Sequence, residues 1–410
     1  MAALFLMCGL ATGLAAAARS GPPPETSGGR TTIVALAASD PAPAERGWAF
    51  VVSVAGANHR LAVAVDERPG LMAGDTVLLA GTIRLRPSRL HRNDVAGWMS
   101  AREVAVLARA DGWMGAANAV RTRVFGLFPE ADAGAALMRG FLIGDTSAIP
   151  PLAIEEMKRA GLVHFVAVSG GNVALFLGAV WLGLGILRLG PRQRAALGLA
   201  AVLLFVLVTR WEPSVVRAGL MVGLVLGARL LGVPLAGWSA LGLALTVALL
   251  VSPELLFDVG FQLSVLATAG LLLGSRLWDS RRPRPVWRAL AATLSAQLAV
   301  SPLLIATFGS VPAFAAVTNV LAAPVVTAAT ALGWAATFLN LRIVAGGAGW
   351  LADAVLELSR LATSLPQVGT IGLLGVIAVA LVAARRPLAG AAAVAILLVA
   401  TLVPATPPPG

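Results

Sequence analysis

Long apolar stretches separated by short polar segments fill most of the chain after residue 160. A membrane-spanning helix needs about 20 mostly apolar residues. Such stretches occur at 161–187, 195–208 with its flanks, 213–231, 235–252, 259–275, 289–341, 361–384 and 387–410. The stretch 289–341 is long enough for two helices, divided near Gly309–Pro312. With 58% apolar and 12% charged residues, the composition also favours a polytopic α-helical membrane protein.

The first 112 residues have a different pattern. We interpret residues 1–20 as an N-terminal membrane helix, because the apolar segment lacks the basic start of a cleaved signal peptide. After the linker Pro22–Pro24, residues 21–112 hold alternating, strand-like runs. The clearest runs are 32–36, 48–54, 60–65 and 76–86. About five short strands favour a small all-β barrel such as an OB-fold inserted after the first helix.

Polar residues interrupt the apolar run from Gly161 to Phe176 (GLVHFVAVSGGNVALF). Polar groups in a bilayer are costly, so this run predicts a broken helix facing protein or a water-filled path. The alternative is close helix packing through small residues. The polar and small residues concerned are His164, Ser169, Gly170, Gly171 and Asn172.

Further polar residues are spaced to share helix faces. Ser214 and Arg217 lie at i, i+3, and Asp258 and Gln262 at i, i+4, so each pair is expected to form one polar edge. Arg217 is either a functional cation near the outer mouth or a structural partner of Asp258 or Glu212. Three more polar residues are candidates for interhelical hydrogen bonds or a pore lining: Gln297, Ser301 and Asn319.

Several segments occur in the order found in one known family. They are Met138–Thr146 (MRGFLIGDT), the run from Gly161 to Phe176, Glu212–Met221 (EPSVVRAGLM), Ser252–Ser264 (SPELLFDVGFQLS), Ala296–Pro302 (AQLAVSP) and Thr318–Pro324 (TNVLAAP). Over roughly residues 31–340 the chain resembles the ComEC family of bacterial competence proteins. The resemblance implies an inner-membrane channel that imports single-stranded DNA during natural transformation. It also implies three protein partners: a cytosolic helicase-type motor, an outer DNA receptor and a separate nuclease. Contact with membrane lipid and a homo-oligomer are further expectations.

The expected organisation has five parts. They are 1–20, the N-terminal membrane helix; 21–112, the extracytoplasmic OB-like β domain; 113–160, an interfacial or re-entrant helical segment; 161–405, the transmembrane channel domain; and 406–410, the tail. Candidates for the DNA path are Asp145, His164, Ser169, Gly170, Gly171, Asn172, Ser214, Arg217, Asp258, Gln262, Ser264, Gln297 and Asn319.

The β domain offers a second place for nucleic acid. Ten arginines and nine acidic residues between 21 and 112 leave a charge of only +1, but one stretch, 84–92, is basic. OB-folds often bind single strands through basic grooves and stacking aromatics. The candidates for DNA contact are Arg84, Arg86, Arg89, Arg92, Trp48 and Trp98. A purely structural or gating domain is the alternative.

The residue content predicts no catalytic residue, no metal site and no cofactor, and hence no enzyme. The single cysteine, Cys8, and three scattered histidines cannot form a Cys-based zinc site or a hydrolytic histidine cluster. Lys158 is the only lysine and has no phosphate-binding loop around it. The resembled family often carries a metallo-β-lactamase-like domain after the channel, and we expect no such domain within these 410 residues.

Arginines flanking the apolar stretches predict the orientation. Arg188, Arg192, Arg194, Arg229, the segment 276–288 and Arg385–Arg386 lie in alternate loops, with Arg210 as the main exception. By the positive-inside rule these loops are cytoplasmic, which places the β domain outside the bacterial inner membrane. The net charge of +11 reflects this asymmetry rather than a DNA-binding patch.

Two other functions fit part of the pattern. A secondary transporter of a small solute would also use broken helices and polar groups at mid-membrane, although no inverted repeat is visible. An intramembrane serine hydrolase using Ser169 and His164 fits less well, because Ala167 breaks the G-x-S-x-G motif.

Overall fold

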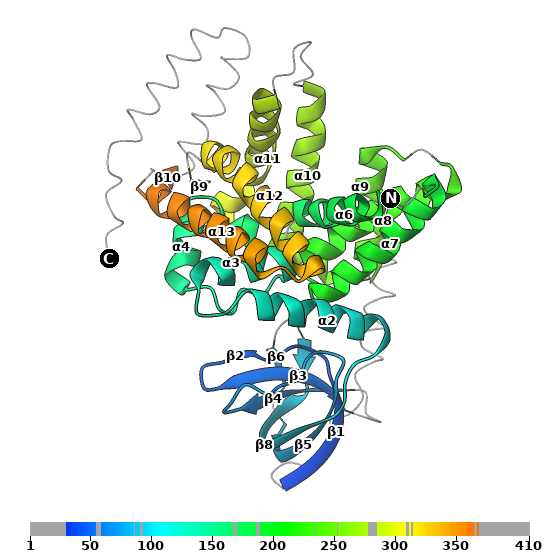
Figure 1. The fold of residues 1–410 in the computed structure, drawn as a ribbon, viewed down its shortest axis with the longest axis vertical. Coiled ribbons are helices and arrows are strands. Elements are labelled where there is room, and N and C mark those ends of the chain that lie inside the picture. The colour runs from blue at the N-terminus through cyan, green and yellow to red at the C-terminus, as the bar shows by residue number, and fades with distance from the viewer. Residues whose placement is uncertain are drawn as a thin grey trace.

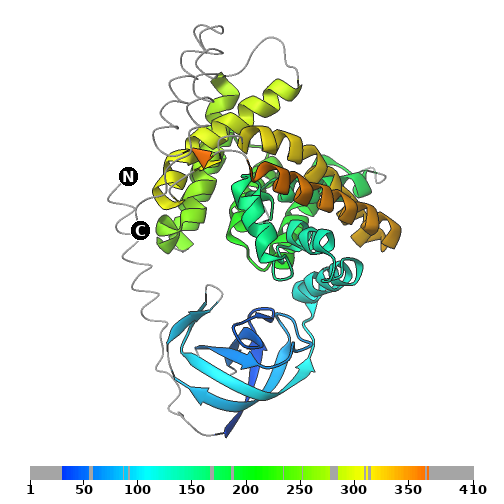
Figure 2. The same cartoon turned by 90° about the vertical axis from the view of Figure 1, so that its left-hand side faces the viewer.

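A β-barrel lies at one end of the molecule and the helices form a bundle at the other, as two perpendicular views show (Figures 1 and 2). This computed structural model describes residues 30–54, 59–85, 87–90, 93–166, 170–185, 189–233, 235–251, 253–277, 285–308, 311–312, 315–364 and 367–368. The expected helix at 1–20, the apolar stretch at 387–410, most of that at 361–384 and the tail at 406–410 lie outside the described residues.

Five main strands close the barrel. They are β1 (Arg30–Ala37), β3 (Trp48–Val54), β4 (Arg60–Val65), β5 (Thr76–Arg84) and β8 (Gly97–Ala108), with the short β2 (Ala42–Pro43) at the edge. The order is β1-β5-β8-β4-β3, and pairing of β1 with β3 closes the ring; only β4 and β8 pair in parallel. A small hairpin, β6 (Ser88–Leu90) and β7 (Asn93–Val95), connects β5 to β8. Inward residues such as Phe50, Val63, Leu79 and Met99 are fully buried.

The four strands that alternation placed along the chain are confirmed. The fifth strand, β8, is longer than the others and was not placed by the sequence, because adjacent Arg102 and Glu103 interrupt its apolar alternation. The register between β5 and β8 shifts at Ala80 and Gly81, opposite this charged pair. Such a bulge changes the face to which successive side chains point, so a strict period of two fails there.

Three helices follow the barrel and lead into the bundle. They are α2 (Gly112–Leu127), α3 (Ala133–Ile143) and α4 (Pro151–Arg159). The remaining elements are α5 (Val163–Val166), α6 (Gly170–Leu184), α7 (Pro191–Val208), α8 (Pro213–Leu231), α9 (Gly237–Val251), η1 (Pro253–Phe257), α10 (Val259–Leu277), α11 (Pro285–Phe308), β9 (Val311–Pro312), α12 (Ala315–Leu339), α13 (Arg342–Ala362) and β10 (Gln367–Val368).

The apolar stretches correspond to these helices. Among the described residues, Pro191–Val208, Pro213–Leu231 and Val317–Leu339 are long and apolar enough to cross a membrane, while five further apolar helices are shorter. The expected division of 289–341 is confirmed, because α11 ends at Phe308 and α12 begins at Ala315. Within the stretch 161–187, the described residues include the helices α5 (Val163–Val166) and α6 (Gly170–Leu184).

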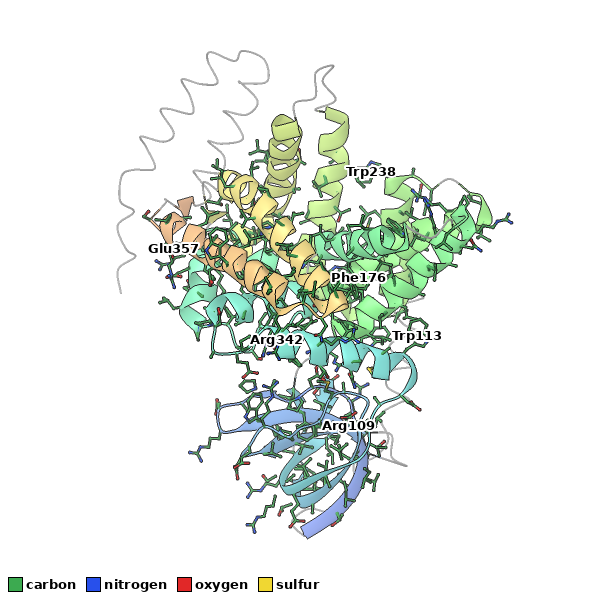
Figure 3. The ribbon with its side chains drawn as sticks, viewed as in Figure 1. Arg109, Trp113, Phe176, Trp238, Arg342 and Glu357 are labelled. Carbon is green, nitrogen blue, oxygen red and sulfur yellow. The ribbon has the colours of Figure 1, made fainter. Side chains whose placement is uncertain are left out.

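The helical core is built around an aromatic cluster. The Phe176 ring stacks on Phe205 at 4.7 Å between centroids and meets Trp334 edge-on at 4.8 Å, which joins α6, α7 and α12 (Figure 3). Helix α13 packs against α12, α3 and α4. Its buried face holds Ala345, Ala352 and Val355.

Candidate functional site

An aspartate of the barrel binds two arginines of the helical bundle. Asp40 lies between β1 and β2, Arg121 on α2, and Arg210 in the turn between α7 and α8. Arg121 Nη2 lies 2.9 Å from Asp40 Oδ2, and Arg210 donates to both carboxylate oxygens at 2.7 and 2.9 Å. Arg210 also donates to Asn118 Oδ1 at 2.7 Å. We call Asp40, Arg121, Arg210 and Asn118 the junction cluster.

The junction cluster is an interior feature. The Arg121 side chain is only 6% exposed, and its Nη1 donates to the carbonyls of Ile143 and Val208. Burial by itself raises the pKa of Asp40, but the charges of Arg121 and Arg210 outweigh it and lower that pKa from 3.8 to about 2. Asp40 is therefore an anion at neutral pH, and it anchors the barrel to α2 and to the turn between α7 and α8.

A second ion cluster joins the barrel to the helices. Arg68, between β4 and β5, contacts Glu130, which also accepts from Arg139 Nη1 at 2.8 Å. Arg139 on α3 is 4% exposed and donates to the Phe128 carbonyl at 2.6 Å. Hydrogen bonds from Arg139 and Arg68 lower the pKa of Glu130. The barrel thus has two separate charged attachments.

The two tryptophans of the barrel that are candidates for base stacking have different surroundings. The Arg68 guanidinium lies 4.9 Å from the Trp48 ring centroid, so one face of Trp48 is covered from within the protein. Trp98 on β8 is paired in register with Arg84 on β5, and its Nε1 donates to Ser88 Oγ at 2.8 Å. Arg86 and Arg92 lie outside the described residues, as does the side chain of Arg89.

The candidates around α6 have different surroundings. Asn172 is buried, and its Nδ2 donates to the Phe141 carbonyl at the end of α3 at 3.0 Å. His164 on α5 is exposed, with Nδ1 3.0 Å from the Gly161 carbonyl. Gly170 and Gly171 are the exposed first residues of α6, while Ser169 lies outside the described residues.

Arg217 connects α8 to the start of α10. Its Nη2 donates to the Gly260 carbonyl at 3.1 Å, and its guanidinium lies 5.5 Å from the Phe261 ring centroid. Arg217, Phe261 and Ser264 line the same small pocket between α8, α9 and α10. A Cβ added to Gly170 would lie 3.3 Å from Ala218 Cβ, so the start of α6 lies beside this part of α8.

The expected helical edge of Asp258 and Gln262 is wrong in one respect, because Asp258 precedes α10. Its Oδ1 accepts from the Phe261 backbone at 2.6 Å, as an N-cap residue does, and Gln262 Nε2 donates to the Leu256 carbonyl at 2.8 Å. Both side chains therefore satisfy backbone groups at the start of one helix. A sequence spacing of a few residues therefore does not by itself distinguish a residue on the face of a helix from one that caps its start.

The remaining path candidates are dispersed. Asp145 accepts from Ser147 in the turn after α3. Ser214 lies in the first turn of α8, Gln297 lies on α11 with its carbonyl accepting from Ser301 Oγ, and Asn319 lies on α12. The structure thus brings together Arg217 and Ser264 in one pocket and places Gly170 beside Ala218 of the same helix α8, but it leaves the other candidates on separate elements.

Sequence reasoning missed the junction residues. Arg121 and Arg139 are arginines on otherwise apolar helix faces, which is a local signal, but nothing local connects Asp40 with a partner 170 positions later.

The region that this chain shares with known proteins begins at the end of α3 and includes the helices from α4 to α13. The sequence model of the family described as Competence protein matches residues 141–405, which is more than half of the chain. The chain belongs to the ComEC family of competence proteins. ComE operon protein 3 of Bacillus subtilis is 28% identical over 248 residues, covering 59% of this chain and 31% of the relative.

A second relative, competence protein ComA of Neisseria gonorrhoeae, is 28% identical over 274 residues, covering 60% of this chain and 39% of that protein. The matches thus span about a third to two fifths of the length of these relatives. No solved structure matches this competence protein.

Proposed function

We propose that this competence protein forms a transmembrane conduit for single-stranded DNA in the bacterial inner membrane, with its β-barrel on the outer side. Family membership supports a role in competence, and the apolar helices support a membrane location. The conduit itself rests on the small pocket that Arg217 and Ser264 line between α8, α9 and α10, and on the close approach of Gly170, at the exposed start of α6, to Ala218 of α8.

The position of Arg217 agrees with this role. Arg210 binds Asp40 of the barrel, and α8 begins three residues later at Pro213, so Arg217 lies about one turn into the helix from the barrel side. With the barrel outside, this cation lies near the outer mouth. A positive charge in a low-dielectric surrounding attracts phosphates more strongly than one in water.

We propose that the barrel is an OB-like domain that guides DNA. Its five-stranded closed order with a single parallel pair supports the OB assignment. Because Arg68 covers one face of Trp48, the pair formed by Trp98 and Arg84 is the better place for stacking and phosphate contact.

We propose no energy source and no catalytic activity for the conduit itself. An inside-negative potential opposes the entry of an anion by about 2.3 kcal/mol per charge for every 100 mV. The strand must therefore be pulled, and we propose a cytosolic helicase-type motor for this step, together with an outer DNA receptor and a separate nuclease that removes one strand.

The test compares uptake of labelled DNA in a deletion strain complemented with variants. Gly170→Leu should reduce uptake at least tenfold, because the new side chain meets Ala218. Gly178→Leu is the matched control on the same helix, since a Cβ there has no neighbour within 4 Å. Arg217→Ala should also reduce uptake, with Arg229→Ala at the exposed end of α8 as its control.

Protein level and thermal melting in detergent separate loss of transport from loss of folding. If Gly170→Leu and Arg217→Ala reach normal levels and import DNA at the unmodified rate, the path does not pass these residues. Loss of uptake in both controls as well would mean that any substitution in α6 or α8 impairs uptake, so that the effect is not specific to Gly170 and Arg217.

A further inference from the structure

A pocket of about 270 Å³ lies between α13 and the segment from the end of α2 to the start of α3. Its charged residues are Asp132, Asp353 and Arg342. The other lining residues include Phe128, Trp350 and two glycines of α13, Gly346 and Gly349. The pocket therefore combines two carboxylates and one guanidinium with apolar walls, and it is separate from the residues proposed for the DNA path.

The two carboxylates are held close to each other. Asp132 caps α3 by accepting from the Ala135 backbone at 3.2 Å. A Cβ built on Gly134, two residues later, would lie only 2.5 Å from Asp353 Oδ1, so the Asp353 carboxylate is in contact with the first turn of α3. Burial and the nearby charge of Asp132 raise the pKa of Asp353. A cation with several hydrogen-bond donors would relieve this repulsion.

The outer face of α13 is apolar beside this pocket. Ile343, Trp350 and Leu361 are 94%, 71% and 72% exposed. Their spacing of seven and eleven residues places all three on one side of the helix. The pocket residues Arg342, Gly346 and Asp353 lie about a quarter turn away, so Trp350 stands at the border between the pocket and the apolar face. Figure 3 labels Arg342, the first residue of this helix, and Glu357 in its C-terminal half.

We propose that this pocket binds the phosphoethanolamine headgroup of a membrane lipid. The ammonium group lies between Asp132 and Asp353, and the phosphate is bound by Arg342. The acyl chains follow the apolar face of α13, and Trp350 lies at the level of the headgroups, where tryptophan is enriched in membrane proteins. The site needs α13 to contact lipid and does not depend on DNA passage, so it is tested without DNA.

The chemistry of the pocket favours a zwitterion over a single ion. Arg342 is a site for a phosphate, while an anionic headgroup without an amine would bring further negative charge beside Asp132 and Asp353 and supply no cation for them. Among the described residues, no group of three or more His, Cys, Asp or Glu side chains could hold a metal ion. An ammonium group, by contrast, needs only two or three acceptors.

The experiment uses the full chain in detergent, with retained lipid measured after adding phosphatidylethanolamine or phosphatidylglycerol at equal concentration. The unmodified protein should retain at least fivefold more phosphatidylethanolamine. Asp353→Asn should remove most of this preference, and Gly346→Leu should abolish retention by filling the pocket. Gly347→Leu is the matched comparison, because it adds the same side chain to open space on the apolar face but outside the pocket, so the preference for phosphatidylethanolamine over phosphatidylglycerol should persist.

Soluble glycerophosphoethanolamine is added as a competitor in a second experiment. Competition by this compound at low concentration shows that the headgroup alone provides the affinity, whereas competition only at high concentration shows that the lipid face contributes. Equal retention of both lipids by the unmodified protein would overturn the proposal. So would unchanged phosphatidylethanolamine retention in folded Asp353→Asn and Gly346→Leu, or thermal protection by Mg²⁺ alone equal to that by the lipid.

Discussion

Asp40 Oδ2 lies 2.9 Å from Arg121 Nη2, and this ion pair connects the β-barrel to the helix that carries the chain into the bundle. Arg121 in turn donates to the last residue of α3, Ile143, and the last residue of α7, Val208. One guanidinium therefore satisfies orphan carbonyls at two helix ends and one carboxylate of another domain. The barrel is held in a defined position over α3 and α7.

Asp40→Asn should destabilise this attachment by about 3 kcal/mol, because it leaves the guanidinium groups of Arg121 and Arg210 close together without an anion. The measurement is hydrogen exchange in α2 together with thermal melting in detergent. Asp66→Asn, an exposed aspartate of the same barrel, is the control and should change neither. Equal protection of α2 in all three proteins would mean that the barrel is held without Asp40.

The same carboxylate predicts a pH dependence. Because the pKa of Asp40 is lowered from 3.8 to about 2, its contribution is complete above about pH 4 and is lost as the pH falls toward 2. Each unit of pKa corresponds to about 1.4 kcal/mol, so the contribution is roughly 2 kcal/mol. The difference in stability between the unmodified protein and Asp40→Asn, followed from pH 6 to pH 2, should shrink over that range. A constant difference would contradict the assignment.

The two arginines that bind Glu130 should differ in their contribution. Arg139→Met removes a buried guanidinium that also donates to the Phe128 carbonyl, so it should lower stability by about 2 kcal/mol or more. Arg68→Met removes a side chain that is 40% exposed and should lower stability by less than about 1 kcal/mol. Melting temperatures in detergent compare the two. Equal losses would show that the burial of Arg139 has no energetic consequence.

Substitution of Asn172 tests whether this residue only stabilises the fold or also lines the DNA path. Its Nδ2 donates to the Phe141 carbonyl in a buried site, so Asn172→Ala should cost roughly 1–2 kcal/mol of stability. If packing is its only role, uptake per folded molecule should stay within about twofold of the unmodified protein. A tenfold loss of uptake at unchanged melting temperature would instead place Asn172 on the DNA path.

Apolar length and strand alternation predicted most elements, because they depend on neighbouring residues alone. The division between α11 and α12 and the strands β3 and β4 follow directly from such local patterns. The contacts between elements could not be derived in this way. In the sequence, Arg210 is notable only because it lies in a loop expected to be poor in arginine. The fold places it against Asp40, which lies 170 positions earlier. Asp258 was likewise read as a helix-face residue, although it caps the helix.

Arg210 and Arg192 lead to a prediction of how α7 is oriented in the membrane. Arg210, after the end of α7, binds the barrel, while Arg192 lies in the exposed first turn of the same helix. A helix of 18 residues is about 27 Å long, close to the apolar thickness of a bilayer. The arginine-rich start of α7 and the barrel should therefore lie on opposite sides of the membrane, with the barrel outside by the positive-inside rule.

Cysteine labelling in intact cells tests this orientation in a Cys8→Ser background. Glu103→Cys on the exposed surface of β8 should react with a membrane-impermeant thiol reagent, and Arg192→Cys should react only after the cells are opened. Denatured samples of both variants provide the control for total reactivity. Labelling of Arg192→Cys alone in intact cells would reverse the orientation and place the barrel in the cytoplasm. Labelling of both would show that α7 does not span the membrane, because the barrel contact at Arg210 fixes one end of that helix.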